Sequence, residues 1–502
     1  MLGGVTSDAP RGATDDAVGL RMGTPAGRWV LATTVLGSGL AMLDSTVVNV
    51  ALERIGSDFG SAFAGLQWTV NAYTLTLAGF ILLGGSLGDR FGRRRIFLIG
   101  VVWFALASAL CGFAPSIEVL IGARALQGVG GALLTPGSLA LISASFHGSD
   151  RAAAIGAWSG LAGVAGAVGP FVGGWLVEWT WRAVFLINLP VAAVVVAAAL
   201  RHVPESRDPQ AVPRLDVPGT VLALLGLGAL TWSLTEAGTA GASPAVVVTG
   251  LAGVVALVTF ALVERRSRSP LVPTDLFANS RFSALNVVTL LVYAALGVLF
   301  VLLVLQLQVV AGFSPLEAGV STLPITVIML LLSARAGRLS SRIGPRIPMT
   351  VGLVTAAGGM LLLLRVGVGA SYLLDVLPAV VLFGLGLSAT VAPLTAAVLD
   401  AADDRHAGVA SGVNNAVARA AGLLAVAVIP AAAGIAGADY TDPVAFSAGY
   451  HRAVVIAACL LLGGAVLSGL LLRPLRPRPA GEVPLAECAH CGVSSPQQYP
   501  RS

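Results

Sequence analysis

The chain has 502 residues, of which 56% are hydrophobic and 11% are charged. A soluble domain has about 45–50% apolar and roughly 25% charged residues, so the composition excludes an ordinary soluble protein. The basic residues are all arginine and give a formal net charge of +5. Because arginines of membrane proteins usually mark cytoplasmic loops, we expect no nucleic-acid partner.

The apolar residues fall into long uncharged runs, each approaching the ~20 residues that cross ~30 Å of hydrocarbon. Lipid offers no partners to backbone N–H and C=O groups, so these runs must be helices. We predict an all-α polytopic membrane protein with fourteen transmembrane helices. The predicted spans are 29–52, 63–86, 96–114, 118–144, 152–177, 183–202, 216–236, 244–263, 283–310, 318–335, 347–365, 375–398, 406–434 and 450–472. The first run is too long for a signal-peptide core, so we expect a retained helix.

Arginines in the short loops orient the chain, because such loops are cytoplasmic when they are rich in basic residues. Those on one side are Arg90, Arg93, Arg94, Arg95, Arg201, Arg207, Arg214, Arg265, Arg266, Arg268, Arg281, Arg335, Arg338, Arg342 and Arg346. The opposite loops carry little beyond Arg54, Arg182 and Arg365. We therefore expect a bacterial inner-membrane protein with both termini in the cytoplasm.

A carboxylate stands inside the first predicted span, at Asp44, and a guanidinium inside the fourth, at Arg124. Intramembrane charges are costly and usually functional. At 1.5 Å per residue, Asp44 lies roughly 12 Å and Arg124 roughly 9 Å from the outer ends of their spans, so their depths agree. Desolvation favours the neutral form of a carboxyl, whereas a nearby cation favours the charged form. Our hypothesis is that Asp44 binds and releases a coupling proton; the alternative is a structural acid paired with an arginine.

The loop after the second span combines glycines, one acid and several arginines. Its residues of interest are Gly85, Asp89, Arg90, Gly92, Arg93 and Arg94. A simple positive-inside loop needs neither the glycines nor Asp89. The loop recurs as 337–345, at an offset of 252, with Ser341 in the place of Asp89, and Asp150-Arg151 recurs as Asp404-Arg405.

This repeat indicates two six-helix bundles separated by two inserted helices. We expect a cytoplasmic tail at 1–28, bundles at 29–202 and 276–474, a linker with two helices at 203–275 and a disordered tail at 475–502. Parallel repeats of this kind place a substrate cavity at mid-membrane between halves that rock against each other.

Two further spans carry unusual residues. The fifth has small residues recurring every three or four positions, which lets another helix approach closely, and generic close packing is the alternative interpretation. Its residues of interest are Gly166, Gly169, Pro170, Gly173 and Gly174. The thirteenth span carries an arginine that either contacts an anionic or polar substrate or is structural. The candidate cavity residues are Asn71, Gln127, Asn414, Asn415 and Arg419, with Tyr73, Gln306 and Gln308 as further polar positions.

The string Gly85-x-Leu-x-Asp-Arg-x-Gly-Arg-Arg94 is similar to the signature of the major facilitator superfamily. By resemblance, Asp89 is a conformational latch that sits against a helix N-terminus and neighbouring arginines. Arg124 matches the fourth-helix motif, and Gly169-Pro170-x-x-Gly173-Gly174 is similar to the fifth-helix motif of members that exchange substrate for protons.

Residues 43–52 and 181–190 resemble motifs of the fourteen-helix drug:proton antiporters, the EmrB/QacA-like branch, although Glu53 stands where proline is usual. For the segment 181–190, an interfacial aromatic anchor is the simpler interpretation. The resemblance implies a monomeric, proton-coupled antiporter that exports amphipathic organic compounds, with a small molecule, protons and the lipid bilayer as partners. The alternatives are a same-fold exporter or importer of a metabolite and, behind it, a channel or receptor.

We expect no enzyme activity, no cofactor and no metal. The sequence has no nucleotide-binding glycine loop, and Cys488 and Cys491 with His490 offer fewer than the four ligands usual for structural zinc.

Overall fold

A computed structural model describes residues 20–207, 216–241, 243–267, 272, 274–402, 407–435 and 442–472. The terminal segment 475–502, with Cys488 and Cys491, and the pair Asp404-Arg405 lie outside these residues, as does most of the segment 1–28. In the described part the chain is helical, without strands, and one isolated bridge joins Leu20 to Phe146. It contains fourteen helices long and apolar enough to cross a membrane, which confirms the predicted number.

Several membrane-length helices are built from two shorter pieces. The elements are α1 (Pro25–Phe59), α2 (Phe63–Phe91), α3 (Arg93–Gly112), α4 (Ile117–Ser145), α5 (Gly148–Trp179), α6 (Ala183–Leu186), α7 (Asn188–His202), α8 (Val217–Ala240), α9 (Pro244–Arg266), η1 (Thr274–Ala278), α10 (Ser280–Leu305), η2 (Gln306–Val310), α11 (Pro315–Ser321), α12 (Leu323–Ile343), α13 (Arg346–Leu362), η3 (Leu363–Arg365), η4 (Tyr372–Val376), α14 (Leu377–Asp400), α15 (Ala407–Ala432) and α16 (Pro443–Leu471).

The first helix shows why apolar runs underestimate helix length. The hydroxyl of Thr24 caps its start by accepting from the backbone N–H of Gly27, and Pro25 occupies the first turn, where its missing N–H is not needed. The apolar run ends at residue 52, but α1 continues to Phe59 and ends at Gly60 with φ +58°. Glycine adopts such a φ at little cost, so the helix ends there and not at the first charge.

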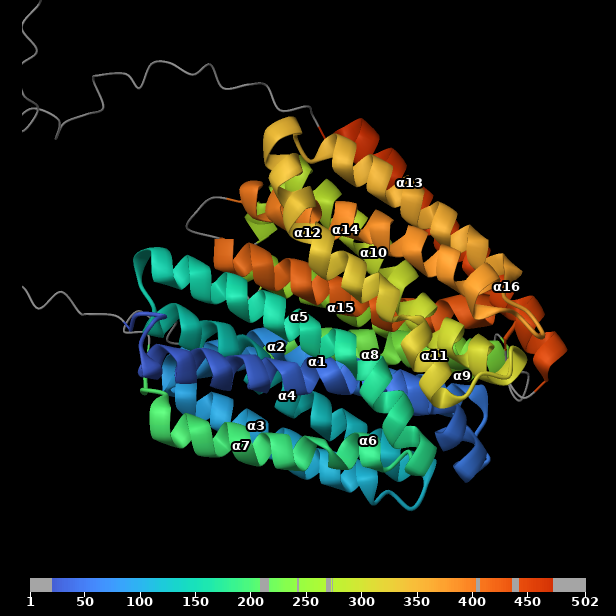
Figure 1. The fold of residues 1–502 in the computed structure, drawn as a ribbon, viewed down its shortest axis with the longest axis horizontal. Coiled ribbons are helices and arrows are strands. Elements are labelled where there is room, and N and C mark those ends of the chain that lie inside the picture. Colours follow the sequence, from blue (N-terminus) through green and yellow to red (C-terminus); the bar gives the residue numbers. More distant parts are fainter. Residues whose placement is uncertain are drawn as a thin grey trace, which may run out of the picture.

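The helices form two bundles, α1–α7 and α10–α16, drawn from blue to green and from yellow to red in Figure 1. The duplication is visible in the backbone, because α2 spans 63–91 and the pair α11–α12 spans 315–343, again 252 residues apart. Positive-φ glycines recur at the same offset, Gly60 with Gly312 and Gly92 with Gly344. The two bundles are therefore structural repeats.

The inserted helices α8 and α9 pack against each other, and α8 lies along both α2 and α15. A Cβ on Gly79 of α2 would lie 2.9 Å from Leu224, and one on Gly238 would lie 3.1 Å from Ala431 of α15. Helix α8 thus lies along the junction where the two bundles meet on that side.

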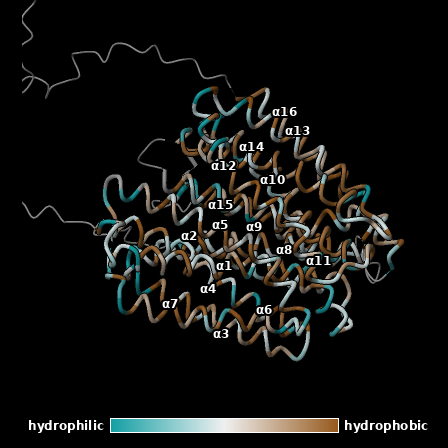
Figure 2. The backbone as a smooth tube through the Cα atoms, viewed as in Figure 1, coloured by the Kyte–Doolittle hydropathy of each residue, from teal (hydrophilic) through white to brown (hydrophobic). Residues whose placement is uncertain are grey.

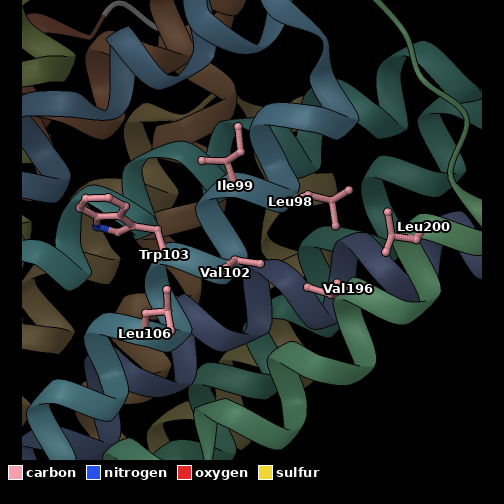
Figure 3. A pocket seen from close by; sticks show the side chains of 7 residues that line it. All are labelled: Leu98, Ile99, Val102, Trp103, Leu106, Val196 and Leu200. Atoms are coloured by element: carbon pink, nitrogen blue, oxygen red, sulfur yellow. The ribbon is translucent and has the colours of Figure 1, made fainter.

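The outer surface of the bundles is apolar, as lipid-facing helices require. Figure 2 shows hydrophobic residues along the helices and hydrophilic residues towards their ends. Figure 3 shows part of this surface, a shallow groove on α3 and α7. Leu98, Ile99, Val102, Trp103, Leu106, Val196 and Leu200 line it. The side chain of Leu106 is 63% exposed, so the groove belongs to the lipid-facing surface and not to the interior.

Candidate functional site

The side chains of Asp44 and Arg124 form an ion pair inside the amino-terminal bundle. Nη1 of Arg124 lies 2.5 Å from Oδ2 of Asp44, and both side chains are at most 1% exposed. Nε of Arg124 donates to the carbonyl of Thr69 at 3.1 Å. The guanidinium carbon lies 4.3 Å from the ring centre of Tyr73 and 5.7 Å from that of Phe185, within the range of cation–π attraction. The guanidinium is therefore held by α1, α2 and the α6 segment at once.

The other oxygen of Asp44 is held by two amides. Oδ1 accepts from Nε2 of Gln127 at 2.8 Å and from Nδ2 of Asn188 at 3.0 Å. Both amides also donate to the hydroxyl of Ser108, which itself donates to the carbonyl of Phe185 at 2.8 Å. Gln127, Ser108 and Asn188 are fully buried, so this polar network has no access to water.

The carboxylate of Asp44 is the acceptor in all of its hydrogen bonds. Oδ2 accepts from Arg124, and Oδ1 accepts from Gln127 and Asn188. A protonated carboxyl needs an acceptor for its own O–H, whereas an ionised one only accepts. The observed arrangement therefore suits the ionised form of Asp44.

Two of the residues around Asp44, Asn188 and Ser108, are not predicted from the sequence. Asn188 lies within the segment 181–190, which reads as an aromatic anchor, and Ser108 is one of many small residues in an apolar run. Their depth in the membrane could have identified them, because it matches that of Arg124. At 1.5 Å per residue, Asn188 lies roughly 8 Å and Ser108 roughly 9 Å from the same ends of their predicted spans as Arg124.

The glycine motif of α5 is divided between two contacts. A Cβ on Gly173 would lie 3.1 Å from Val47 of α1, and one on Gly169 would overlap the hydroxyl of Thr46; Gly166 faces Met42 less closely. A Cβ on Gly174 would instead lie 2.5 Å from Cα of Leu316 in α11. The motif therefore packs α5 both within its own bundle and against the other one.

The same face of α5 is open towards its beginning. Gly156, Gly160 and Gly163 precede Gly174 at helical spacing, yet no heavy atom lies within 4 Å of a Cβ placed on any of them. Successive membrane helices alternate in direction, so the start of α5 lies at the end of the molecule that holds the arginine-rich loops. We call this the arginine-rich end and the other the far end. Along α5, the seam between the bundles is closed at the far end and open at the arginine-rich end.

Two glutamines bridge the bundles near the far end. Nε2 of Gln67 in α2 donates to the carbonyl of Val426 in α15 at 2.5 Å. Nε2 of Gln308, after α10, donates to the carbonyl of Val50 in α1 at 3.1 Å. Each bundle thus donates one hydrogen bond to the other.

The candidate cavity residues occupy different environments. Gln127 belongs to the Asp44 network, and the side chain of Asn414 accepts from Thr289 of α10 at 2.8 Å within its own bundle. Asn71 is 1% exposed, and neither end of its amide has a partner in the described part of the chain. Asn415 is exposed and Arg419 is half-buried on α15.

Arg419 has no hydrogen bond or ion pair with any described residue. Its charge acts on the hydroxyls of Tyr73 in α2 and Tyr293 in α10. It therefore lies within electrostatic range of a tyrosine of each bundle, near the junction between them.

The segment expected as a loop after the second span is almost entirely helical, because α2 continues to Phe91 and α3 begins at Arg93. Oδ1 of Asp89, in the last turn of α2, pairs with Nε of Arg93, the first residue of α3, at 2.8 Å. A different acid holds the start of α3. The carboxylate of Glu205 accepts from the backbone N–H groups of Arg94 at 3.1 Å and Arg95 at 3.2 Å. Gly92, with φ +113°, leaves room for it, since a Cβ there would lie 2.9 Å from the Glu205 carboxylate.

Among the described residues, no group of three or more His, Cys, Asp or Glu side chains is arranged to hold a metal ion.

Known proteins resemble the chain in sequence and in fold. The family model of the Major Facilitator Superfamily matches residues 34–426. The puromycin resistance protein pur8 of Streptomyces alboniger is 38% identical over 458 residues, which cover 88% of this chain and 91% of that protein. The tetracenomycin C resistance and export protein of Streptomyces glaucescens is 37% identical over 433 residues, which cover 84% and 79%.

A solved structure of a bacterial homologue of the human lysosomal transporter Spinster, in an inward-facing and unoccupied conformation, has the same fold. It aligns with a TM-score of 0.61 and 19% identity over 89% of this chain and 97% of that one. The duplicated helical bundles, the family model and the relatives agree: the chain is a multi-pass membrane transporter, not an enzyme, and belongs to the Major Facilitator Superfamily.

Proposed function

We propose that the protein is a proton-driven antiporter that exports amphipathic organic compounds from a bacterial cell across its inner membrane. The observation that carries the proposal is the buried ion pair of Asp44 and Arg124. A carboxylate enclosed in this way releases or binds a proton only when its surroundings change, which is what coupling requires.

The orientation follows from the arginine-rich loops, which we assign with both termini to the cytoplasm. The open end of the seam then faces the cytoplasm, and Asp44 is ionised in this conformation. A compound enters from the cytoplasm, and the bundles rock to close the arginine-rich end and open the far end. There Asp44 takes up a proton as the compound leaves, and the protonated protein returns.

The segment 85–94, where α2 meets α3, and the α5 glycines serve this movement. Asp89 is half-buried and pairs only with the nearby Arg93, so we propose that it contacts the carboxy-terminal bundle when the arginine-rich end closes. The open stripe of Gly156, Gly160 and Gly163 provides the matching surface, because helices approach most closely over small residues.

The substrate is proposed from the relatives, which are named for resistance to or export of puromycin and tetracenomycin C. Arg419 and Asn415 lie on α15 next to the junction of the bundles, and we propose that they contact the exported compound. Arg419 is a fixed positive charge without a described partner, which also favours the second candidate, a same-fold transporter of one specific anionic or polar metabolite. We expect the protein to act as a monomer.

Cells that lack their own exporters, expressing wild type or Asp44→Asn, test the proposal against a panel of antibiotics and dyes. Wild type should lower the accumulation of some compounds until the proton gradient is collapsed, and Asp44→Asn should not. Export against a gradient by Asp44→Asn with intact proton coupling would refute it.

A further inference from the structure

Asn188 is the first residue of α7, directly after the single-residue interruption at Ile187 that separates α7 from α6. Pro190 follows within the first turn and has no N–H to donate to the carbonyl of Leu186. The interruption lies at the depth of Asp44, and the amide of Asn188 points to its carboxylate, with Nδ2 3.0 Å from Oδ1.

The nitrogen and the oxygen of the Asn188 amide differ in their hydrogen bonds. Nδ2 donates twice, to Asp44 and to Ser108 at 2.9 Å. Oδ1 is buried and has no hydrogen-bond partner among the described residues. A buried acceptor without a donor costs free energy, so this oxygen is available to any donor that appears nearby.

Protonation of Asp44 supplies such a donor. The proton adds to Oδ1 of the carboxylate, which then has an O–H to donate in place of a lone pair. Its neighbours there, Gln127 and Asn188, both present N–H groups to it, but Oε1 of Gln127 already accepts from Arg124 at 2.7 Å. The oxygen of Asn188 is the free acceptor.

We propose that Asn188 is a positioning residue whose amide donates to the ionised Asp44 and, after rotating about its Cβ–Cγ bond, accepts from the protonated Asp44. The inference rests on the proposed function, since it assumes that Asp44 titrates during transport. No covalent bond of Asn188 changes; one N–H···O bond to Asp44 is replaced by one O–H···O bond.

The rotation has a structural consequence because it also removes the bond from Nδ2 to Ser108. The segment that carries Asn188 is fixed at the far end as well, where Asp58 near the end of α1 accepts from Nε1 of Trp181 at 2.9 Å and from Nη1 of Arg182 at 3.0 Å. The segment 181–188 therefore contacts α1 at two depths. Protonation keeps one hydrogen bond between Asn188 and Asp44 but removes the bond to Ser108, so around Asp44 α7 is released from α3 while both of the segment's contacts with α1 remain.

The charged and titratable groups around Asp44 are few. Arg124 of α4 pairs with it, and Tyr73 of α2 and Cys111 of α3 interact with it electrostatically. The neighbouring helices α5, α7 and α11 carry their charged residues near their ends; on α10, Arg281 lies at one end and Tyr293 faces Arg419. The amide of Asn188 is therefore the uncharged group that can respond differently to the ionised and the protonated form of Asp44.

The test is an infrared titration of the purified protein, which needs no substrate. The carbonyl band of a protonated carboxyl that is present in wild type and absent in Asp44→Asn reports the protonation of Asp44. Asn188→Leu removes the bond that the amide donates to the ionised Asp44 and the bond that it accepts from the protonated Asp44. The bond to the charged form is the stronger one, so the ionised form loses more. We expect the titration midpoint to move up by about one pH unit, a tenfold change in proton affinity. The side-chain amide band that shifts with this titration in wild type should be absent.

Asn286→Leu is the matched control. Asn286 is also a buried asparagine, 4% exposed, but its Nδ2 bonds to the carbonyl of Phe282 in its own helix α10. The Asn286→Leu variant should leave both the titration midpoint of Asp44 and the shift of the side-chain amide band unchanged. If Asn188→Leu does not fold, Asn188→Asp keeps the side-chain shape and places a second carboxylate beside the first, so the midpoint should rise further.

The outcomes separate the two proposals. If no titrating band depends on Asp44, the proton coupling itself is wrong. If the band is present but the Asn188 variants titrate as wild type does, or if Asn286→Leu shifts equally, Asn188 is only structural and the inference is overturned.

Discussion

Nη1 of Arg124 lies 2.5 Å from Oδ2 of Asp44, although the two residues are 80 positions apart in the sequence. The pair is enclosed, so neither charge can be stabilised by water. Removing one partner of a buried ion pair leaves an uncompensated charge and costs about 3–5 kcal/mol. The stability of the amino-terminal bundle should therefore depend on the pair.

Arg124→Leu should lower the unfolding temperature in detergent at neutral pH, because Asp44 then stays buried with amide donors only. The loss should shrink as the pH falls, since a protonated Asp44 needs no cation. The double variant Asp44→Asn/Arg124→Leu should recover much of the stability. An additive double variant would show that the two side chains are not coupled.

The far end should open when its two bridges are removed. Gln67→Leu and Gln308→Leu each delete one hydrogen bond between the bundles, worth about 1 kcal/mol, which shifts a two-state equilibrium about fivefold. Spin labels at Ser61→Cys and Val368→Cys, in a background without the other cysteines, should report longer distances. Gln306→Leu is the control, because Gln306 bonds to Val366 and Ser447 in its own bundle. An equal shift in that control would contradict the assignment.

Glycines on one face of α5 should differ in their tolerance of a side chain. Gly174→Ala places a Cβ 2.5 Å from Cα of Leu316 and 2.7 Å from the carbonyl of Pro315, so the far end should close less completely and transport should fall. Gly160→Ala meets no atom within 4 Å and should leave the stability of this conformation unchanged. Gly160→Leu should hinder closure of the arginine-rich end and hold the protein inward-open in the same spin-label measurement with labels at that end. Normal transport by Gly160→Leu would count against a role of this stripe in closure.

The two acids near the segment 85–94 should affect different properties, Glu205 the stability and Asp89 the transport. Glu205→Gln weakens the cap of α3 and should lower stability by about 1 kcal/mol. Asp89→Asn removes a partly exposed ion pair, which costs at most about 1 kcal/mol. It should nevertheless reduce transport, because Asp89 is proposed to act only when the arginine-rich end closes. Thermal unfolding and transport assays on both variants separate the two roles, and full transport by Asp89→Asn would exclude the latch.

The class of the protein and its internal repeat can be predicted from the amino-acid sequence alone. Apolar runs of membrane length predict fourteen helices, because lipid leaves the backbone no other way to satisfy its hydrogen bonds. The recurrence of the loop 85–93 at an offset of 252 indicates the two bundles. The common depth of Asp44 and Arg124 follows from the constant rise of a helix.

The grouping of the polar side chains around Asp44 depends on how the helices pack and could not be predicted from the sequence. Asn188 and Ser108 reach Asp44 because α7 and α3 pack beside α1, and no local pattern records that packing. Glu205 reaches the start of α3 across more than a hundred residues. The conformation could not be predicted from the sequence either, because the same sequence must allow both an open and a closed seam at each end. The environments of the α5 glycines and the hydrogen bonds of Gln67 and Gln308 between the bundles show that the far end is closed here.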